Sequence, residues 1–180
     1  MGVIRKFKKD ISNLTKDDNG KEKNLLKLTE EQVSLIKRTV AKNATNDELQ
    51  MFLYLAEKYG LDPFARQIWF VKYTEGQAQI FTGRDGYLEI AHRSGVFDGM
   101  KSGIKTEKDG QILGWAEVFR KDMKRSFYVE VYLSEYNTGQ SLWSRKPKTM
   151  IVKVAEAQCL KKAFSISGIY TQEEFGEIEY

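Results

Sequence analysis

Residues 143–162 carry the densest collection of side chains that could do chemistry. This stretch contains one acid, Glu156, and six bases, which are Arg145, Lys146, Lys148, Lys153, Lys161 and Lys162. Cations gathered in this way attract anions. The stretch therefore predicts a binding surface for a polyanion, usually nucleic acid.

The same segment is predicted to form a helix over about residues 148–164, with apolar side chains on almost every side. Lys153 and Lys161 are both expected to project between apolar neighbours. Such lysines either extend their amino groups to solvent at the edge of a packed helix or meet an anion in a groove. The sequence leaves both alternatives open. The helix start, just after Pro147, also offers unpaired backbone N–H groups and the positive end of the helix dipole to a phosphate.

Aromatic residues are interleaved with further bases along the chain, a pattern typical of surfaces that bind single strands by stacking. Most of these aromatic side chains are expected in the core. Trp143, beside a basic loop that contains a proline, is the best candidate for an exposed one. Lys and Arg outnumber Asp and Glu only by 29 to 25, so a solvated lysine-rich surface is the alternative interpretation of the charges.

Several classes of site are excluded or disfavoured. The chain has no P-loop motif, and a single cysteine (Cys159) and a single histidine (His92) leave no basis for a metal cluster or a catalytic triad. Four carboxylates could be imagined as a two-metal nuclease site, namely Asp85, Glu89, Asp98 and Glu117. Their spacing does not favour this over solvated or capping carboxylates. We therefore predict that the chain is not an enzyme and uses no cofactor or metal.

Two helices are predicted near the N-terminus, because Thr29 and Thr45 each begin a capping-box pattern. Gly60 is expected to end the second helix. No apolar run approaches the roughly 20 residues that cross a membrane, and no signal peptide is recognisable. These features predict a protein of the cytoplasm.

The central part of the chain predicts strands. They are expected at residues 67–73, 78–82, 99–106, 112–120 and 126–133, with a short helix at 87–93 and a polar loop at 134–141. The expected fold class is α+β, with N-terminal helices and a central antiparallel β-sheet of about five strands in hairpins, packed with the long helix at about 148–164. Residues 1–28 are expected to be a mobile or assembly arm, and residues 29–180 a single domain.

Three stretches stand out together by their order and spacing. They are YGLDPF followed by RQIW (residues 59–69), GRDGY followed by FDGM (residues 83–100), and PKTMI followed by QC, AF and GIY (residues 147–170). In combination they resemble the RecT/Bet (Redβ-like) family of phage single-strand annealing recombinases. The likeness covers roughly residues 45–175.

The resemblance implies an ATP-independent protein of phage homologous recombination. Such a protein binds single-stranded DNA in a basic groove with the bases exposed, forms oligomers or helical filaments, and pairs complementary strands through an annealed duplex intermediate. The site residues expected from the resemblance and from the basic segment are Lys72, Arg84, Asn137, Gln140, Trp143, Arg145, Lys148, Lys153 and Lys161. The alternative function is a single-strand DNA-binding module that protects DNA without annealing it.

Family members usually continue into a C-terminal region, which the resemblance implies docks a phage exonuclease and the host single-strand-binding protein. That region has no counterpart in the 180 residues. These two partners are therefore expected for the family rather than for this chain, and single-stranded DNA and further copies of the chain are the partners expected here.

Overall fold

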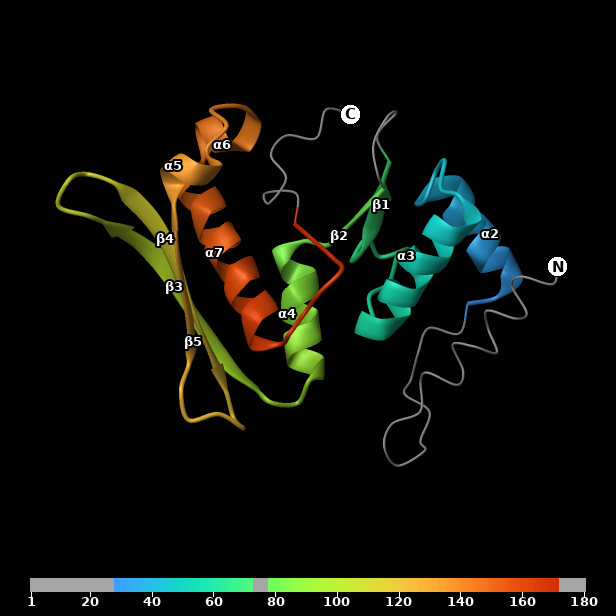
Figure 1. Cartoon of the computed structure of the whole chain (residues 1–180), viewed down its shortest axis with the longest axis horizontal. Coiled ribbons are helices and arrows are strands. Elements are labelled where there is room, and N and C mark those ends of the chain that lie inside the picture. Colours follow the sequence, from blue (N-terminus) through green and yellow to red (C-terminus); the bar gives the residue numbers. More distant parts are fainter. Residues whose placement is uncertain (1–27, 73–77, 172–180) are drawn as a thin grey trace. The chain divides into compact units, whose positions relative to one another are not determined.

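The computed structural model describes residues 28–72 and 78–171 (Figure 1). The chain divides into two compact units between residues 80 and 81. The expected arm at residues 1–28 lies outside the described residues except for its last position. Among the helices that are described, none combines the length and the apolar character that crossing a bilayer requires.

The first unit contains two helices, α2 (Glu30–Thr39) and α3 (Asn46–Tyr59). Both begin with the predicted capping box: in each, the threonine side chain accepts a hydrogen bond from the backbone three residues on, and the side chain there accepts one in return. Helix α3 ends at Gly60, whose φ of 63° is the left-handed conformation that glycine adopts without strain. All three predicted helix signals are therefore confirmed.

The core of the first unit forms where these helices meet the chain that follows Gly60. Six of its side chains are fully buried: Ile36, Ala41, Phe52, Ala56, Leu61 and Ile68. The rings of Phe52 and Phe70 pack edge to face with their centres 6.2 Å apart. Phe70 lies in β1 (Trp69–Val71), which pairs with β2 (Gln79–Phe81) in a two-stranded sheet.

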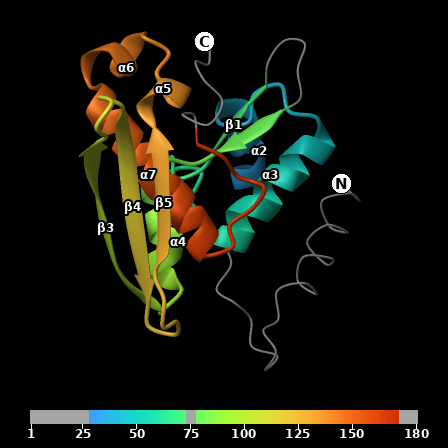
Figure 2. The same ribbon diagram turned by 60° about the vertical axis from the view of Figure 1, so that its left-hand side comes forward.

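The second unit contains a three-stranded antiparallel sheet in the order β3 (Phe97–Thr106), β4 (Ile112–Arg120), β5 (Phe127–Tyr132) (Figure 2). The α+β class is confirmed. The predicted strands are all present in the described residues, but they are divided between two sheets because a helix, α4 (Arg84–Arg93), follows β2 directly. That helix starts three residues before the predicted position.

The long predicted helix is confirmed as α7 (Pro147–Ala163), and it covers one face of the three-stranded sheet (Figures 1 and 2). Alternate residues of the strands point toward it, among them Ala116, Val118 and Val129, which are buried. At Gly114 the strand comes so close that an added Cβ would lie 2.5 Å from the carbonyl oxygen of Ile151. Helix α4 packs against α7 as well.

The expected polar loop between β5 and α7 is partly helical. It begins with α5 (Leu133–Tyr136) and leads into α6 (Ser141–Arg145). The hydrogen bond from Gln158 Nε2 to the hydroxyl of Tyr136, at 2.6 Å, ties α5 to α7. The connection is therefore a pair of short helices docked on α7, and not an unstructured loop.

Candidate nucleic-acid interface

The polar and basic side chains between β5 and α7 collect around the N-terminal end of α7. We call five exposed side chains of this region, the last of them in the first turn of α7, the α6–α7 junction: Asn137, Gln140, Arg145, Lys146 and Lys148. No acidic residue occurs between Glu135 and Glu156. The junction is therefore a concentrated positive surface with no nearby carboxylate in its own stretch of chain to neutralise it.

The backbone adds to this positive end. Helix α7 starts with Pro147 at its first position and has no side-chain cap, and the N–H of Met150 is the first to bond back, to the Lys146 carbonyl at 3.1 Å. An uncapped N-terminus of a 17-residue helix carries partial positive charge beside Lys148. The geometry at the start of α7 therefore fits the prediction that its free backbone N–H groups can help to bind an anion.

The loop that precedes α6 is ordered by its own side chains. The side-chain oxygen of Asn137 accepts a hydrogen bond from the N–H of Gly139 at 2.9 Å. Gln140 occupies the N-cap of α6 without using its side chain for capping. The amide of Gln140 is therefore available to a ligand, whereas the amide oxygen of Asn137 is already engaged.

The prediction that Trp143 is exposed is wrong. Only 6% of it is accessible, because it lies on the side of α6 that packs against the rest of the second unit. Its neighbour Leu142 is the exposed one, at 49%. A helix of five residues has little stability of its own. Trp143 therefore anchors the junction from beneath and offers no face for a base to stack on.

Lys153 and Lys161 are both half-buried on α7, as expected for lysines among apolar neighbours. The amino group of Lys161 lies 4.5 Å from the centre of the Tyr170 ring, a cation–π contact. Spacings of five and eight residues turn a helix by about 140° and 80°, so the lysines at 148, 153 and 161 do not form one row. Lys148 belongs to the junction, while the other two lie farther along the helix.

Arg84 is placed at the start of α4, between two carboxylates. Its Nε lies 3.1 Å from Asp85 and 3.5 Å from Glu156 of α7, which are ion-pair distances. Glu156 is 8% exposed and also accepts a hydrogen bond from the hydroxyl of Ser102 in β3 at 2.6 Å. The Arg84 guanidinium therefore helps to join α4, α7 and the sheet, and part of its charge is already neutralised.

Lys72 lies in the first unit, where its amino group is 2.8 Å from Glu48. The hydrogen bond from Lys72 is the main reason that the pKa of Glu48 is lowered. This lysine is engaged within its own unit, and a ligand would have to compete with Glu48 for it.

The four carboxylates considered for a nuclease site are engaged separately or stand apart. Asp85 pairs with Arg84, Glu89 with Arg93 at 2.8 Å, and Glu117 accepts a hydrogen bond from Ser126 at 2.6 Å, while Asp98 is exposed. Across residues 28–72 and 78–171, no three metal-ligating side chains gather. The geometry gives no support to metal-dependent cleavage at these positions.

Two residues of this region were missed by the sequence reasoning. Lys146 was counted among the bases but not placed in the site, although it is exposed at the junction. Glu156 was noted only as the single acid of its segment. A lone acid on a basic helix is itself a signal of a specific partner, but its partners, Arg84 and Ser102, lie more than 50 residues away in sequence and could not be found by spacing.

The comparisons with known proteins agree with the motifs. The sequence model of the RecT family matches residues 26–180. The chain is similar to a protein named recombination protein bet, of Escherichia phage lambda, with 26% identity over 156 residues, or 81% of this chain. It spans 58% of the length of that relative.

Proposed function

Because the chain belongs to the RecT family, we propose that it is an ATP-independent single-strand annealing protein of phage homologous recombination. It binds single-stranded DNA through the phosphate backbone and pairs that strand with its complement. It needs no cofactor, because base pairing itself supplies the free energy of the reaction.

The observation that carries this proposal is the α6–α7 junction. Three exposed cations and an uncapped helix N-terminus stand together there, in a stretch without acids. Bringing two polyanionic strands together is opposed by Coulomb repulsion, and cations held on a folded surface offset it while releasing counterions. A surface of this kind suits a nucleic-acid backbone better than a small anion, because its cations are spread over several residues.

The predicted residues take different roles in this proposal. Arg145 and Lys148 bind phosphates directly, and Gln140 and Asn137 approach the same strand from the preceding loop. Lys153 and Lys161 continue the positive charge along α7 below the junction. Trp143 supports the junction from within, and Arg84 and Lys72 contribute only if they exchange their present carboxylate partners for phosphates.

The mechanism follows from contacts with the backbone alone. Phosphates held on the protein leave the base edges free, so that complementarity is tested by pairing and not by the protein. Copies of the chain assembled along one strand would each add a weak site, and the summed avidity would hold the strand and then the annealed duplex intermediate. Single-stranded DNA, the duplex intermediate and further copies of the chain are thus the proposed partners.

The test mixes the protein with two complementary labelled oligonucleotides, added one after the other, without ATP. We expect faster pairing than without protein. The acceleration should be lost in Lys148→Ala/Lys153→Ala and retained in the matched control Lys108→Ala, an exposed lysine of the β3–β4 turn. The salt dependence of single-strand binding should become shallower by about 0.7 to 1 for each lost phosphate contact.

Two other outcomes would replace the proposal. Tight binding that slows pairing would identify the module that protects DNA without annealing it. Degradation of the oligonucleotides that requires Mg²⁺ and stops in Asp85→Ala would identify a nuclease.

A further inference from the structure

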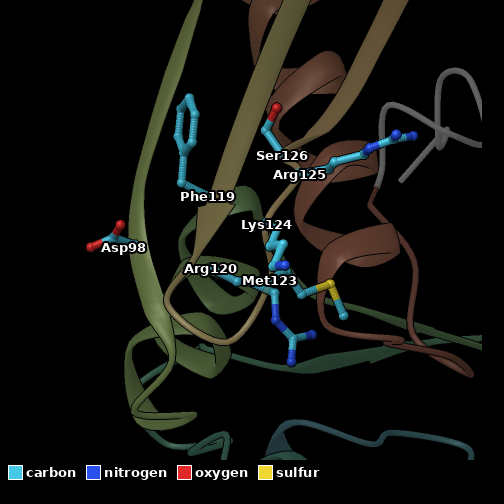
Figure 3. A pocket seen from close by; sticks show the side chains of 7 residues that line it. All are labelled: Asp98, Phe119, Arg120, Met123, Lys124, Arg125 and Ser126. Carbon is cyan, nitrogen blue, oxygen red and sulfur yellow. The ribbon is translucent and has the colours of Figure 1, made fainter.

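A second collection of cations lies at the opposite end of α7 from the junction, in the turn between β4 and β5. The turn opens a hollow of about 460 Å³, lined by residues 119, 120 and 123–126 and by Asp98 of β3 (Figure 3). This volume lies within the range of sites that hold small ligands or a part of a polymer. The hollow belongs entirely to the second unit.

Arg120 builds the hollow and is not available to a ligand. Its guanidinium donates to Asp122 at 2.6 and 2.9 Å and also to the carbonyl of Ala163, at the end of α7. The hydrogen bond from Arg120 lowers the pKa of Asp122, so this carboxylate is charged and paired near neutral pH. The pair cancels in charge and holds the turn against α7.

The remaining cations of the turn have no such partner. Lys121, Lys124 and Arg125 are exposed, and none of the ion pairs found among the described residues involves them. The one unpaired acid in the lining, Asp98, is the additional residue of a β-bulge, because Phe97 and Gly99 pair with consecutive residues of β4. Its carboxylate points away from Lys124 and Arg125 in Figure 3.

This lack of pairing distinguishes the turn from the strands around it. On the sheet, Lys105 pairs with Glu107 and Glu130, each at 3.3 Å. Three like charges within five residues repel one another, and none of the ion pairs found in the described part of the chain offsets them. Met123, 47% exposed, and Phe119 add apolar surface beside the charges, which suits the sugar and base of a nucleotide better than it suits a hydrated inorganic ion.

We propose that the hollow at the β4–β5 turn is a second phosphate-binding site for nucleic acid, in which Lys124 and Arg125 hold the backbone of a strand. The proposal rests on the DNA-binding function proposed above and adds to it a contact that does not involve the junction. A guanidinium binds a phosphate with two parallel hydrogen bonds, and the neighbouring ammonium group adds a mobile point charge. The turn and the junction would then contact nucleic acid at the two ends of α7, about 25 Å apart for a helix of this length.

The test compares Lys124→Gln and Arg125→Gln with Lys108→Gln, which removes a charge that is also exposed from the turn at the other end of β4. Binding of a labelled single-stranded oligonucleotide is followed by fluorescence anisotropy over a range of salt concentrations. We expect each substitution in the β4–β5 turn to weaken binding severalfold and to reduce the salt slope by about 0.7. Lys108→Gln should leave the slope unchanged. Thermal unfolding should be unaffected in all three variants, because the side chains are exposed.

The same titration separates the two proposals. If the wild-type protein does not bind the oligonucleotide, the proposed function fails. If Lys148→Ala lowers the slope while both β4–β5 variants follow Lys108→Gln, only the second site is overturned. Inorganic phosphate, at equal ionic strength, should compete no better than chloride; strong competition would assign the hollow to a free anion. Loss of polyglutamate binding without loss of DNA binding would assign it to an acidic protein.

Discussion

The two faces of the three-stranded sheet are built in opposite ways. The face under α7 is closely packed and mostly apolar, with Gly114 against the backbone of Ile151 and Cys159 buried beneath β5. The other face carries aromatic and charged side chains, among them Trp115 stacked on Tyr128 with ring centres 6.3 Å apart. Lys101 lies 5.3 Å from the ring centre of Phe119 on this outer face, and Lys105 is paired with carboxylates.

The contrast indicates where an anion can bind. Cations on the outer face of the sheet already contact carboxylates or rings, so their charge is partly used within the fold. Within the part of the second unit that the structure describes, the cations without ion-pair partners include those of the α6–α7 junction and of the β4–β5 turn. The inner face contributes to binding indirectly, because it fixes the helix on which the junction is built.

The largest effect is expected from adding a methyl group to the inner face. In Gly114→Ala the new Cβ would lie 2.5 Å from Ile151 O and 2.8 Å from Ile151 C, and backbone atoms cannot move aside independently. We expect the free energy of unfolding to fall by about 3 kcal/mol, measured by urea denaturation. The matched change Gly103→Ala, on the outer face, meets the Trp115 ring at 3.1 Å. Because that ring can turn, we expect Gly103→Ala to lower the free energy of unfolding by less than about 1 kcal/mol. Equal losses would remove the distinction between the faces.

A smaller loss is expected when the buried carboxylate of the inner face is removed. Glu156→Ala leaves the Ser102 hydroxyl without an acceptor and Arg84 without its α7 partner. We expect the free energy of unfolding, measured by urea denaturation, to fall by about 2 kcal/mol. Glu156→Leu combined with Arg84→Met should recover part of this, because the paired charges are removed together. A double variant less stable than Glu156→Ala would contradict the pairing of these two residues.

Cys159 reports on the same face through its reactivity. Burial raises the pKa of its thiol to about 11, and its Sγ lies 3.1 Å from the Phe127 carbonyl. Because the thiolate is the reactive form, its concentration at pH 8 should be about a hundredfold lower than for an ordinary thiol with the reference pKa of 9.0. We expect slow reaction with a disulfide reagent in buffer and fast reaction in denaturant. A fast reaction under native conditions would show that β5 separates readily from α7.

The local parts of this structure were predictable from sequence, and the distant ones were not. The two capping boxes and Gly60 fix helix ends within a few residues, so Thr29, Thr45 and Gly60 were assigned correctly. The exposure of Trp143 was predicted wrongly, because its burial depends on how α6 docks on α7. For the same reason Glu156 could not be connected with Ser102. The cations of the junction were identifiable, but which predicted cations already have carboxylate partners, as Lys72 and Arg84 do, emerges only in the folded chain.

The smallest effect is expected on the outer face, where Tyr128 donates a hydrogen bond to Glu130 at 2.6 Å. This bond is the main reason that the pKa of Glu130 is lowered and that of Tyr128 is raised. Because the pKa of Glu130 is lower in the folded than in the unfolded chain, the bond adds stability at pH values above the pKa of the unfolded state. That stability is lost as the pH falls through the pKa of the folded state. Because the pKa of Tyr128 is higher in the folded than in the unfolded chain, the bond also adds stability at pH values below the phenol pKa of the unfolded state. That stability is lost as the pH rises through the phenol pKa of the folded state.

Tyr128→Phe should therefore lower the free energy of unfolding by about 0.5 kcal/mol near pH 7, with the difference from wild type shrinking at acidic and at alkaline pH. Urea denaturation at acidic, neutral and alkaline pH tests this. A neutral-pH loss as large as that of Glu156→Ala would mean that the outer face is held as firmly as the inner one.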